Sequence, residues 1–441
     1  MPEESAHPGE LAPGMFVSEV PSGLRSVTGA GTSTPAFLGY TLRADVRDPG
    51  FYTPMPVRSW GEFTDRYATT PQGTSLFEEL GKAVRRGEDT VLGALSAVTG
   101  DRTPAAAGPE IERGLALSEA VYGFFANGGS SCYVVPLPAD DGRFASLVTA
   151  LEGDAKARTG LAGLEAVPHV TMVVAPDLAV SAPTDRELAV GAQKIAAHCA
   201  KMRNRMVILD TRHDPAGKPM TTAPALVTDH QQQQFAAVYY PWVQVPGVDG
   251  KPRTVPPSGH IAGVWARTDD ERGVFKAPAN VSLQEVTGLS VSLTDEQQGP
   301  LNERGVNCLR AFPGRGPMVW GARTLATDGE WRYLNVRRFA CFLSDSIEQS
   351  TRWAVFEPND ERLWSSLRHA VTGFLADQWR RGALQGAKPD EAFYVICDKT
   401  NNPDDAIAQG QVQCDIGVAP VRPAEFVHIT IRQKAGQPTT S

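Results

Sequence analysis

Residues 170–210 read VTMVVAPDLAVSAPTDRELAVGAQKIAAHCAKMRNRMVILD. The apolar runs 170–175 and 206–210 have the length and composition of buried strands. Between them, Pro183-Thr184-Asp185 is a helix-start signal. One face of that helix carries Leu188, Ala192, Ile195 and Cys199. A strand, a helix and a second strand at this spacing predict a βαβ unit, so the chain is expected to have an α/β (mixed α+β) fold with a partly parallel central sheet.

The flanking sequence extends this pattern in both directions. Apolar strands are predicted at 36–40, 132–137 and 306–312, and one longer strand at 236–245. A capping box, Thr294-Asp295-Glu296-Gln297, opens one helix. Asn335 is expected to cap a later helix, and Asn359-Asp360 to open another. The expected architecture is therefore a sheet with helices on its faces.

Composition excludes several classes of protein. The 441 residues are 41% hydrophobic and 21% charged, which is typical of a globular chain and not of a disordered one. The net charge of −8 argues against nucleic acid or an anionic membrane as the main partner. No apolar run approaches the roughly 18 residues of a membrane span, and the acidic N-terminus lacks the features of a signal peptide.

Motifs for catalysis or cofactor binding are missing from the sequence. No P-loop, HExxH or GxSxG pattern occurs, and Gly29-Ala30-Gly31 precedes a strand instead of opening a helix. The six cysteines form no CxxC pair and are expected to be buried free thiols. We therefore predict no catalytic residue, cofactor or metal site. Asp210 and Asp398, each just after an apolar strand, are the candidates if the chain is instead a soluble α/β enzyme.

Several long motifs, taken in order, resemble the sheath proteins of contractile phage tails and of phage-tail-like injection systems. They are PGMFVSEVPSGLRSVTGAGTSTPAFLGYT (13–41), LSEAVYGFFANGGSSCYVVPL (117–137), YYPWVQVPGVDGKPRTVPPSGHIAGVW (239–265), LTDEQQGPLNERGVNCLRAFPGRGPMVWGARTL (293–325), NDERLWSSLRHAVTGFLADQWRRGALQG (359–386) and IGVAPVRPAEFVHITI (416–431). The resemblance runs from about residue 13 to 432 and is weakest at 87–112 and 140–165, where we expect variable insertions.

The resemblance implies a structural subunit that polymerises as stacked six-subunit rings around an inner tube and contracts to drive that tube through a target envelope. Neighbouring subunits would be linked by β-augmentation through strands at both chain ends. The predicted N-terminal arm strand comprises Met15, Phe16, Val17, Ser18, Glu19 and Val20. The predicted C-terminal arm strand comprises Phe426, Val427, His428, Ile429, Thr430 and Ile431. On the residues alone, pairing of both strands within their own chain is an open alternative.

The resemblance also implies an organisation and a set of partners. The expected regions are an N-terminal arm with its linker (1–24), an N-terminal and middle α/β region (25–290), a C-terminal sheath domain (291–424) and a C-terminal arm and tail (425–441). Expected partners are further copies of the chain, an inner tube protein, and baseplate and cap or terminator proteins, with assembly in the cytoplasm of the producing cell. A non-contractile shell or adaptor on the same fold is a further alternative.

One helix of the sheath C-terminal domain is implied to face the inner tube with positive charge. The candidates are Arg362, Arg368, Arg380 and Arg381 on the long helix predicted after Asp360. Arg337 and Arg338 on the preceding helix are second choices. A solvated basic face with no partner is the alternative interpretation.

Overall fold

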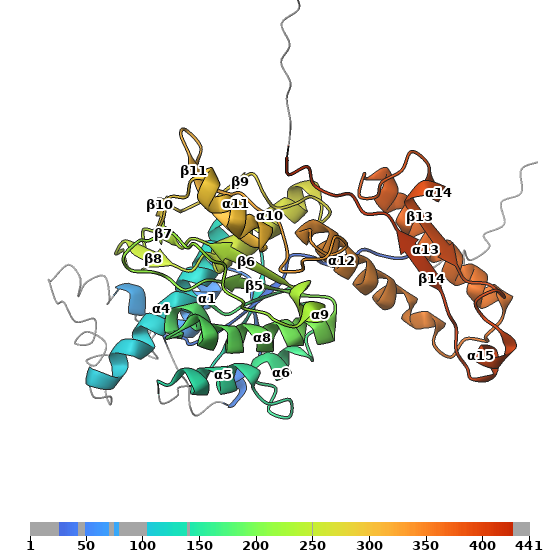
Figure 1. Ribbon diagram of the computed structural model, residues 1–441. Helices are drawn as coiled ribbons and strands as arrows, with labels where there is room; N and C mark the ends of the chain where they lie inside the picture. Colours follow the sequence, from blue (N-terminus) through green and yellow to red (C-terminus); the bar gives the residue numbers. More distant parts are fainter. Residues whose placement is uncertain are drawn as a thin grey trace, which may run out of the picture.

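The computed structural model describes residues 26–42, 49–69, 75–78, 104–138, 142–248 and 250–426. An α/β core made from residues up to 333 carries an elongated C-terminal unit, residues 334–421, on one side (Figure 1). No helix in the described part of the chain combines the length and the apolarity needed to span a bilayer.

A nine-stranded sheet organises the core. Its strands lie in the order β2-β3-β1-β4-β5-β6-β11-β12-β9. Those from β3 to β11 are parallel, and β2, β12 and β9 extend the two edges in antiparallel pairing. The strands are β1 (Pro35–Gly39), β2 (Met55–Val57), β3 (Cys132–Pro136), β4 (Met172–Val174), β5 (Met206–Asp210), β6 (Ala236–Tyr240), β9 (Val281–Ser282), β11 (Val306–Phe312) and β12 (Gly316–Val319). The predicted partly parallel sheet is confirmed.

Helices pack on both faces of this sheet. Successive side chains of a strand point to opposite faces, so neighbouring residues enter different apolar clusters. In β1, Leu38 packs with α5 to α8, whereas Phe37 packs with α1, α4 and α10. The core helices are η1 (Pro49–Tyr52), α1 (Trp60–Tyr67), α4 (Pro104–Ala126), α5 (Phe144–Glu152), α6 (Gly160–Leu164), α7 (Pro176–Ser181), α8 (Asp185–Met202), α9 (His230–Gln233), α10 (Ser258–Arg272) and α11 (Asp295–Glu303). The predicted unit over 170–210 is β4, α8 and β5, with β4 and β5 parallel.

Local signals place several element boundaries. Thr184 caps α8 by accepting from the Glu187 amide, and Thr294 and Gln297 form the predicted capping box of α11. The predicted single strand 236–245 is wrong: Pro241, which cannot donate a ladder hydrogen bond, separates β6 from β7 (Val243–Val245). β7 belongs to a three-stranded sheet with β8 (Arg253–Val255) and β10 (Gly288–Leu289).

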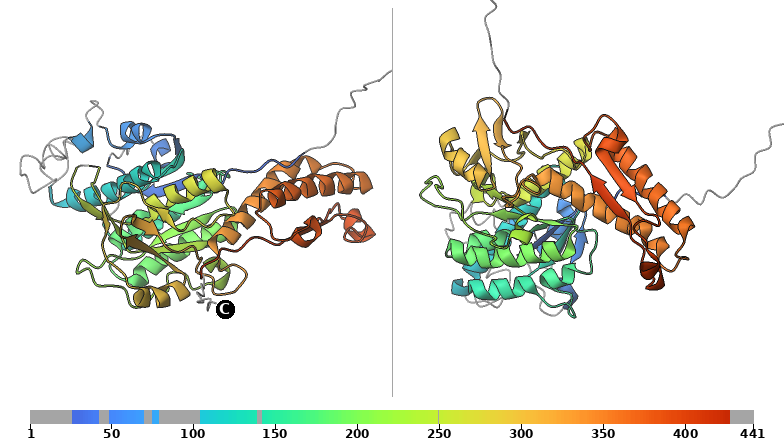
Figure 2. Two further views of the ribbon diagram at one scale, coloured as in Figure 1. Left: turned by 90° about the horizontal axis from the view of Figure 1, so that it is seen from above. Right: turned by 45° about the vertical axis from the view of Figure 1, so that its right-hand side comes forward.

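The C-terminal unit consists of two long helices with a small sheet. Its elements are α12 (Leu334–Thr351), η2 (Arg352–Ala354), α13 (Glu361–Arg380), α14 (Pro389–Ala392), β13 (Phe393–Ile396), α15 (Asp404–Ala408) and β14 (Asp415–Val418). α12 leaves the core and continues along the unit, as both views in Figure 2 show. β13 and β14 pair antiparallel in a sheet of two strands.

The segments where variable insertions are expected, 87–112 and 140–165, contain helices where the structure describes them. Residues 144–152 and 160–164 form α5 and α6, which bury Leu147, Leu151 and Leu161 against the sheet. The apolar residues of α5 recur at helical spacing. That these segments are variable insertions stays a prediction. Residues 104–112 belong to α4, and 87–103 lie outside the described residues.

Strands from both sides of the predicted division at residue 291 enter the large sheet. β11 pairs in parallel with β6, Val306 lying opposite Val238. The division therefore does not separate two sheets, and residues 291–333 complete the core before α12 begins.

Candidate functional site

The junction between the core and the C-terminal unit is held by Arg338 on α12. Its guanidinium donates two hydrogen bonds to Asp269 of α10, at 2.8 and 2.6 Å, and one to the Thr32 carbonyl at 3.2 Å. The guanidinium also lies 4.6 Å from the centroid of the Trp265 ring. Both charged side chains are 4% exposed. Burial raises the pKa of Asp269, and Arg338 opposes that shift by stabilising the carboxylate.

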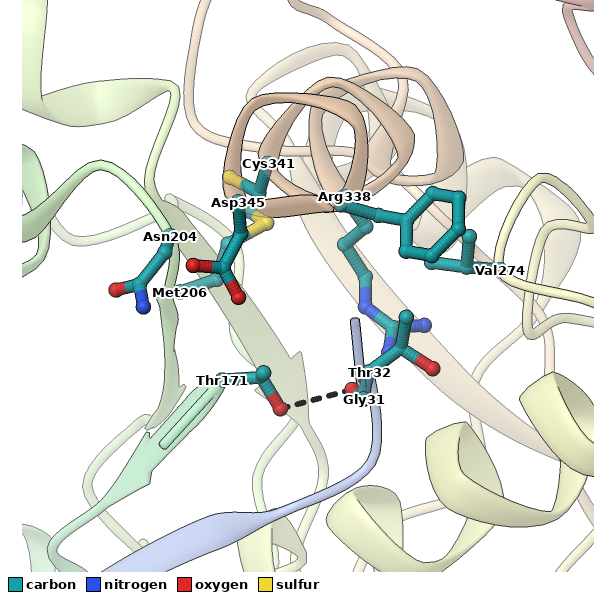
Figure 3. A pocket seen from close by; sticks show the side chains of 10 residues that line it. Gly31, Thr32, Thr171, Asn204, Met206, Val274, Arg338, Cys341 and Asp345 are labelled. Carbon is teal, nitrogen blue, oxygen red and sulfur yellow. Dashed lines mark hydrogen bonds between the residues drawn. The ribbon is translucent and has the colours of Figure 1, made fainter. Parts of the chain in front are cut away.

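Figure 3 shows a small pocket beside this ion pair. It is lined by the linker residues Gly31 and Thr32, by Thr171 just before β4, by Met206 of β5, and by Asp345 of α12. Thr171 donates to the Thr32 carbonyl at 2.8 Å. Three segments that are distant in the sequence, the N-terminal linker, the sheet and α12, therefore meet at this point.

Two neighbours of Arg338 strengthen the same junction. Arg337 lies over the rings of Phe235 and Trp331, at 4.4 and 4.5 Å, and donates to Gln234 at 2.9 Å. Asn335 donates to the carbonyls of Phe275 and Val421. The expectation that Asn335 caps α12 is wrong, because the helix begins at Leu334 and its N-cap position is Tyr333.

The N-terminal linker, residues 26–34, is attached to α12 before it enters β1. The Thr28 amide donates to Ser350 Oγ at 3.0 Å and the Ala30 amide to Ser346 Oγ at 2.9 Å. At Gly29 a Cβ atom would approach the Phe342 ring to 3.3 Å, so the linker lies close against the helix. The predicted arm strand Met15–Val20 lies outside the described residues.

The C-terminal segment is attached to the core. Arg323 Nε donates to both carboxylate oxygens of Glu425, at 2.8 and 3.2 Å, and a further Arg323 nitrogen contacts the same carboxylate. Hydrogen bonding to Glu425 raises the pKa of Arg323. The next residue, Phe426, is 71% exposed. Residues 427–431 of the predicted arm strand lie outside the described residues.

The four candidate tube-facing arginines lie on α13 or, for Arg381, at its C-cap position, but they do not form one patch. Arg362 is exposed in the first turn, and Arg380 and Arg381 lie at the other end, about 28 Å away at 1.5 Å per residue. Arg368 is half-buried and donates to the Cys397 carbonyl at 2.6 Å. Arg380 and Arg381 both pair with Asp377, at 3.8 and 2.8 Å. Tube contact by these residues stays a prediction.

Arg337 and Arg338 are not available for a tube. Their guanidinium groups bind within the chain, at the junction described above. Sequence alone does not reveal that their partners Gln234 and Asp269 lie on distant segments.

Comparison with known proteins identifies the fold family. Residues 153–325 match the family model of the phage tail sheath protein central domain, and 326–434 match the phage tail sheath C-terminal domain. The helical sheath of the anti-feeding prophage in its contracted state is 30% identical, with a TM-score of 0.69 over 96% of this chain and 99% of that one. The chain belongs to the contractile tail sheath family.

Other sheath proteins are similar over different lengths. The contracted sheath of an extracellular contractile injection system is 27% identical, with a TM-score of 0.65 over 96% of this chain and 98% of that one. The tail sheath protein of Vibrio phage KVP40 is 29% identical over 40% of this chain but only 26% of its own length. That of Escherichia phage P2 is 26% identical over 63% of this chain and 67% of its own length. The match thus spans a quarter to two-thirds of these two phage relatives.

The two acidic residues of the enzyme alternative have structural roles in this sheath chain. Asp210 accepts from the Ser258 amide at 2.8 Å and from Ser258 Oγ at 2.5 Å, at the N-terminus of α10. Burial raises the pKa of Asp210 to about 7. Asp398 accepts from Thr400 in an exposed turn. Among the described residues no group of three or more His, Cys, Asp or Glu side chains is arranged to hold a metal ion.

Proposed function

We propose that this chain is the subunit of a contractile sheath, polymerising as stacked six-subunit rings around an inner tube and contracting to drive the tube through a target envelope. Family membership supports this function, as does the similarity to a contracted sheath along 96% of the chain. Its partners are then further copies of the chain, the tube protein, and baseplate and cap proteins, assembled in the cytoplasm of the producing cell.

The observation that carries the proposal is that the two ends of the described chain are attached to opposite parts of the molecule. The linker 26–34 is bound to α12, whereas Glu425 is bound to Arg323 in the core. Each predicted arm strand therefore starts from a fixed point, and the two points lie on different units. A subunit built in this way reaches two different neighbours, which is the requirement for a continuous lattice.

The sheet of the C-terminal unit is the proposed acceptor for the arms. β13 and β14 have no further strand partner among the described residues, so each offers an edge with free backbone donors and acceptors. Two-stranded sheets are at best marginally stable alone. Tyr394 of β13 is 57% exposed, although it is aromatic. Strands from neighbouring subunits would pair with these edges and cover such side chains.

Substitution on the two faces of the C-terminal arm tests this function. In the alternating segment 426–431, Ile429 lies on the apolar face and Thr430 on the polar face. Ile429→Asp puts a charge where the arm packs, and is expected to abolish helical tubes in negative-stain micrographs. Thr430→Asp adds the same charge on the other face and is expected to leave tubes intact.

The folded monomer provides the control. Both variants are expected to melt within about 1 °C of the wild-type monomer, because the proposed partner of the arm is a neighbouring subunit and not its own chain. Tubes formed equally by Ile429→Asp would refute arm exchange. A chain lacking residues 1–20 tests the other arm in the same way: normal assembly and contraction without those residues would contradict the proposal.

A further inference from the structure

Cys397 and Cys414 face each other at one end of the β13–β14 hairpin. The antiparallel register pairs Phe393 with Val418 and ends with Ile396 opposite Asp415. Continued by one step, it places Cys397 opposite Cys414. Directly opposed residues of antiparallel strands have Cα atoms about 4.5–5.5 Å apart, which lies inside the roughly 4.4–6.8 Å range of disulfides.

The surroundings hold the two thiols together. Cys397 is buried and Cys414 partly buried, and both pack against Leu363, Trp364 and Leu367 of α13. The loop between them is fixed by Asn402, which donates to the Gln413 carbonyl at 2.9 Å and accepts from its amide at 2.7 Å. The thiols are thus kept in contact by structure on both sides, and their meeting does not depend on a mobile segment.

The other four cysteines have different environments. Cys132, Cys199, Cys308 and Cys341 are all buried in the core or at its junction with α12. Cys414 is the one cysteine of the six that is not fully buried. A small oxidant in solution therefore has access to this pair through Cys414.

We propose that Cys397 and Cys414 form a redox site, a dithiol that oxidises to a disulfide closing the loop 397–414. The site is independent of the function proposed above, because it depends only on the fold of the C-terminal unit. The oxidant is a low-molecular-weight disulfide such as oxidised glutathione.

Two thiol–disulfide exchanges complete the reaction. The hydrogen bond that Cys397 donates to the Cys414 sulfur raises the pKa of Cys397, which burial raises further, and lowers the pKa of Cys414. The Cys414 thiolate therefore attacks glutathione disulfide first, forming a mixed disulfide and releasing one glutathione thiolate. The Cys397 sulfur, losing its proton to solvent, then attacks the Cys414 sulfur and displaces the second glutathione. Two protein thiols are oxidised and one glutathione disulfide is reduced to two thiols.

The disulfide would tie the end of the hairpin to the loop that carries α15. Closing this loop removes conformational freedom from the unfolded chain, so the oxidised C-terminal unit resists unfolding more than the reduced one. In a reducing compartment the pair is a dithiol, and in oxidising surroundings it becomes a cross-link.

Peptide mapping of the full-length chain tests the site directly. Trypsin cleaves after Lys399, between the two cysteines, so oxidation is expected to link peptides 382–399 and 400–432 with the loss of two hydrogens. In native protein treated with oxidised glutathione, the count of free thiols is expected to fall from six to four. Six remaining thiols, or a link between other cysteines, would overturn the proposal.

Two variants separate the steps. Cys397→Ser is expected to stop at the mixed disulfide and to carry one glutathione on the peptide that contains Cys414. Cys308→Ala, which removes a cysteine from the core sheet, is expected to form the 397–414 link as the wild type does. If Cys397→Ser gains no glutathione while the wild type still becomes linked, Cys414 is not the attacking residue and the proposed mechanism is wrong.

Discussion

The core and the C-terminal unit differ in how completely they bury their own apolar surface. Among the described residues the core contains a nine-stranded sheet with apolar side chains buried on both of its faces, and large side chains such as Trp265 and Phe124 are fully buried there. The C-terminal unit has a sheet of two strands and smaller apolar clusters, and it leaves Val355, Phe356 and Tyr394 more than half exposed. The core is therefore stabilised by its own contacts, whereas the C-terminal unit keeps surface and strand edges that suit contacts with other chains.

Polar, directional contacts connect the two regions beside the apolar packing of α12 on the core. Arg338, Arg337 and Asn335 lie in the first turns of α12 and bind groups on four distant segments. Such hydrogen bonds fix the direction in which a helix leaves a domain, because their distances and angles are restricted more tightly than those of apolar contacts. A junction of this kind holds the C-terminal unit in a fixed orientation relative to the core.

Replacement of Arg338 is expected to cause the largest loss of unfolding free energy, because it breaks the buried ion pair between the two regions. Arg338→Met leaves the Asp269 carboxylate buried without its partner, which costs about 3–5 kcal/mol of unfolding free energy. Urea unfolding followed by tryptophan fluorescence would measure the loss, because Trp265 lies directly beneath the guanidinium.

An arginine directly after the same helix, in η2, is the control. Arg352 is 3.7 Å from Glu348 in an exposed i,i+4 pair, so Arg352→Met is expected to cost at most about 0.5 kcal/mol. Equal losses from the two variants would contradict the view that the junction depends on the buried pair.

Much of the core was predictable from sequence because its signals are local. The run 170–210 predicted β4, α8 and β5, with the helix start at Thr184. Asn359-Asp360 also predicted the start of α13, where Asp360 is the cap and accepts from the Arg362 and Leu363 amides. In each case the apolar periodicity and the capping side chain lie within a few residues of each other.

The junction was not predictable, because it depends on pairs far apart in the chain. Arg338 and Asp269 are separated by 69 positions, and Arg323 and Glu425 by 102. An arginine on an amphipathic helix has the same local sequence signal whether it faces solvent or a buried carboxylate. α5 differs from the junction, because the helical spacing of its apolar residues at 144–151 is a local signal that the sequence alone contains.

The pH dependence of core stability gives the second test. Burial raises the pKa of Asp210 to about 7, whereas an unfolded aspartate titrates near about 3.9. Between these values the folded state binds more protons than the unfolded state, so the contribution of Asp210 falls as pH rises. Asp210→Asn does not titrate, and its stability relative to wild type is expected to increase by about 2–4 kcal/mol between pH 4 and pH 8.

Asp398→Asn is the matched control for that series. Hydrogen bonds from Thr400 lower the pKa of Asp398, so Asp398 titrates below pH 5 and not between pH 5 and pH 8. Its difference from wild type is expected to stay constant from pH 5 to pH 8. A constant difference for Asp210→Asn as well would mean that Asp210 is ionised throughout this range in the folded protein.

Substitutions at the two ends of α13 are expected to change the stability of the monomer least. They also test most directly whether the C-terminal unit binds the tube. Arg362 has three carboxylates close in sequence, those of Glu357, Asp360 and Glu361, whereas Arg380 and Arg381 have only Asp377 in the last turn. The end near residue 380 is therefore the more positive one and should attract an acidic tube surface.

We expect Arg380→Glu/Arg381→Glu to leave the melting temperature of the monomer unchanged and to reduce co-sedimentation of the tube with the sheath several-fold. Arg362→Glu should reduce it less, and added salt should reduce the difference, since exposed charges are screened over about 8–10 Å. The reverse order would place the tube at the first turn of α13, and no loss in either variant would remove this helix from the tube interface.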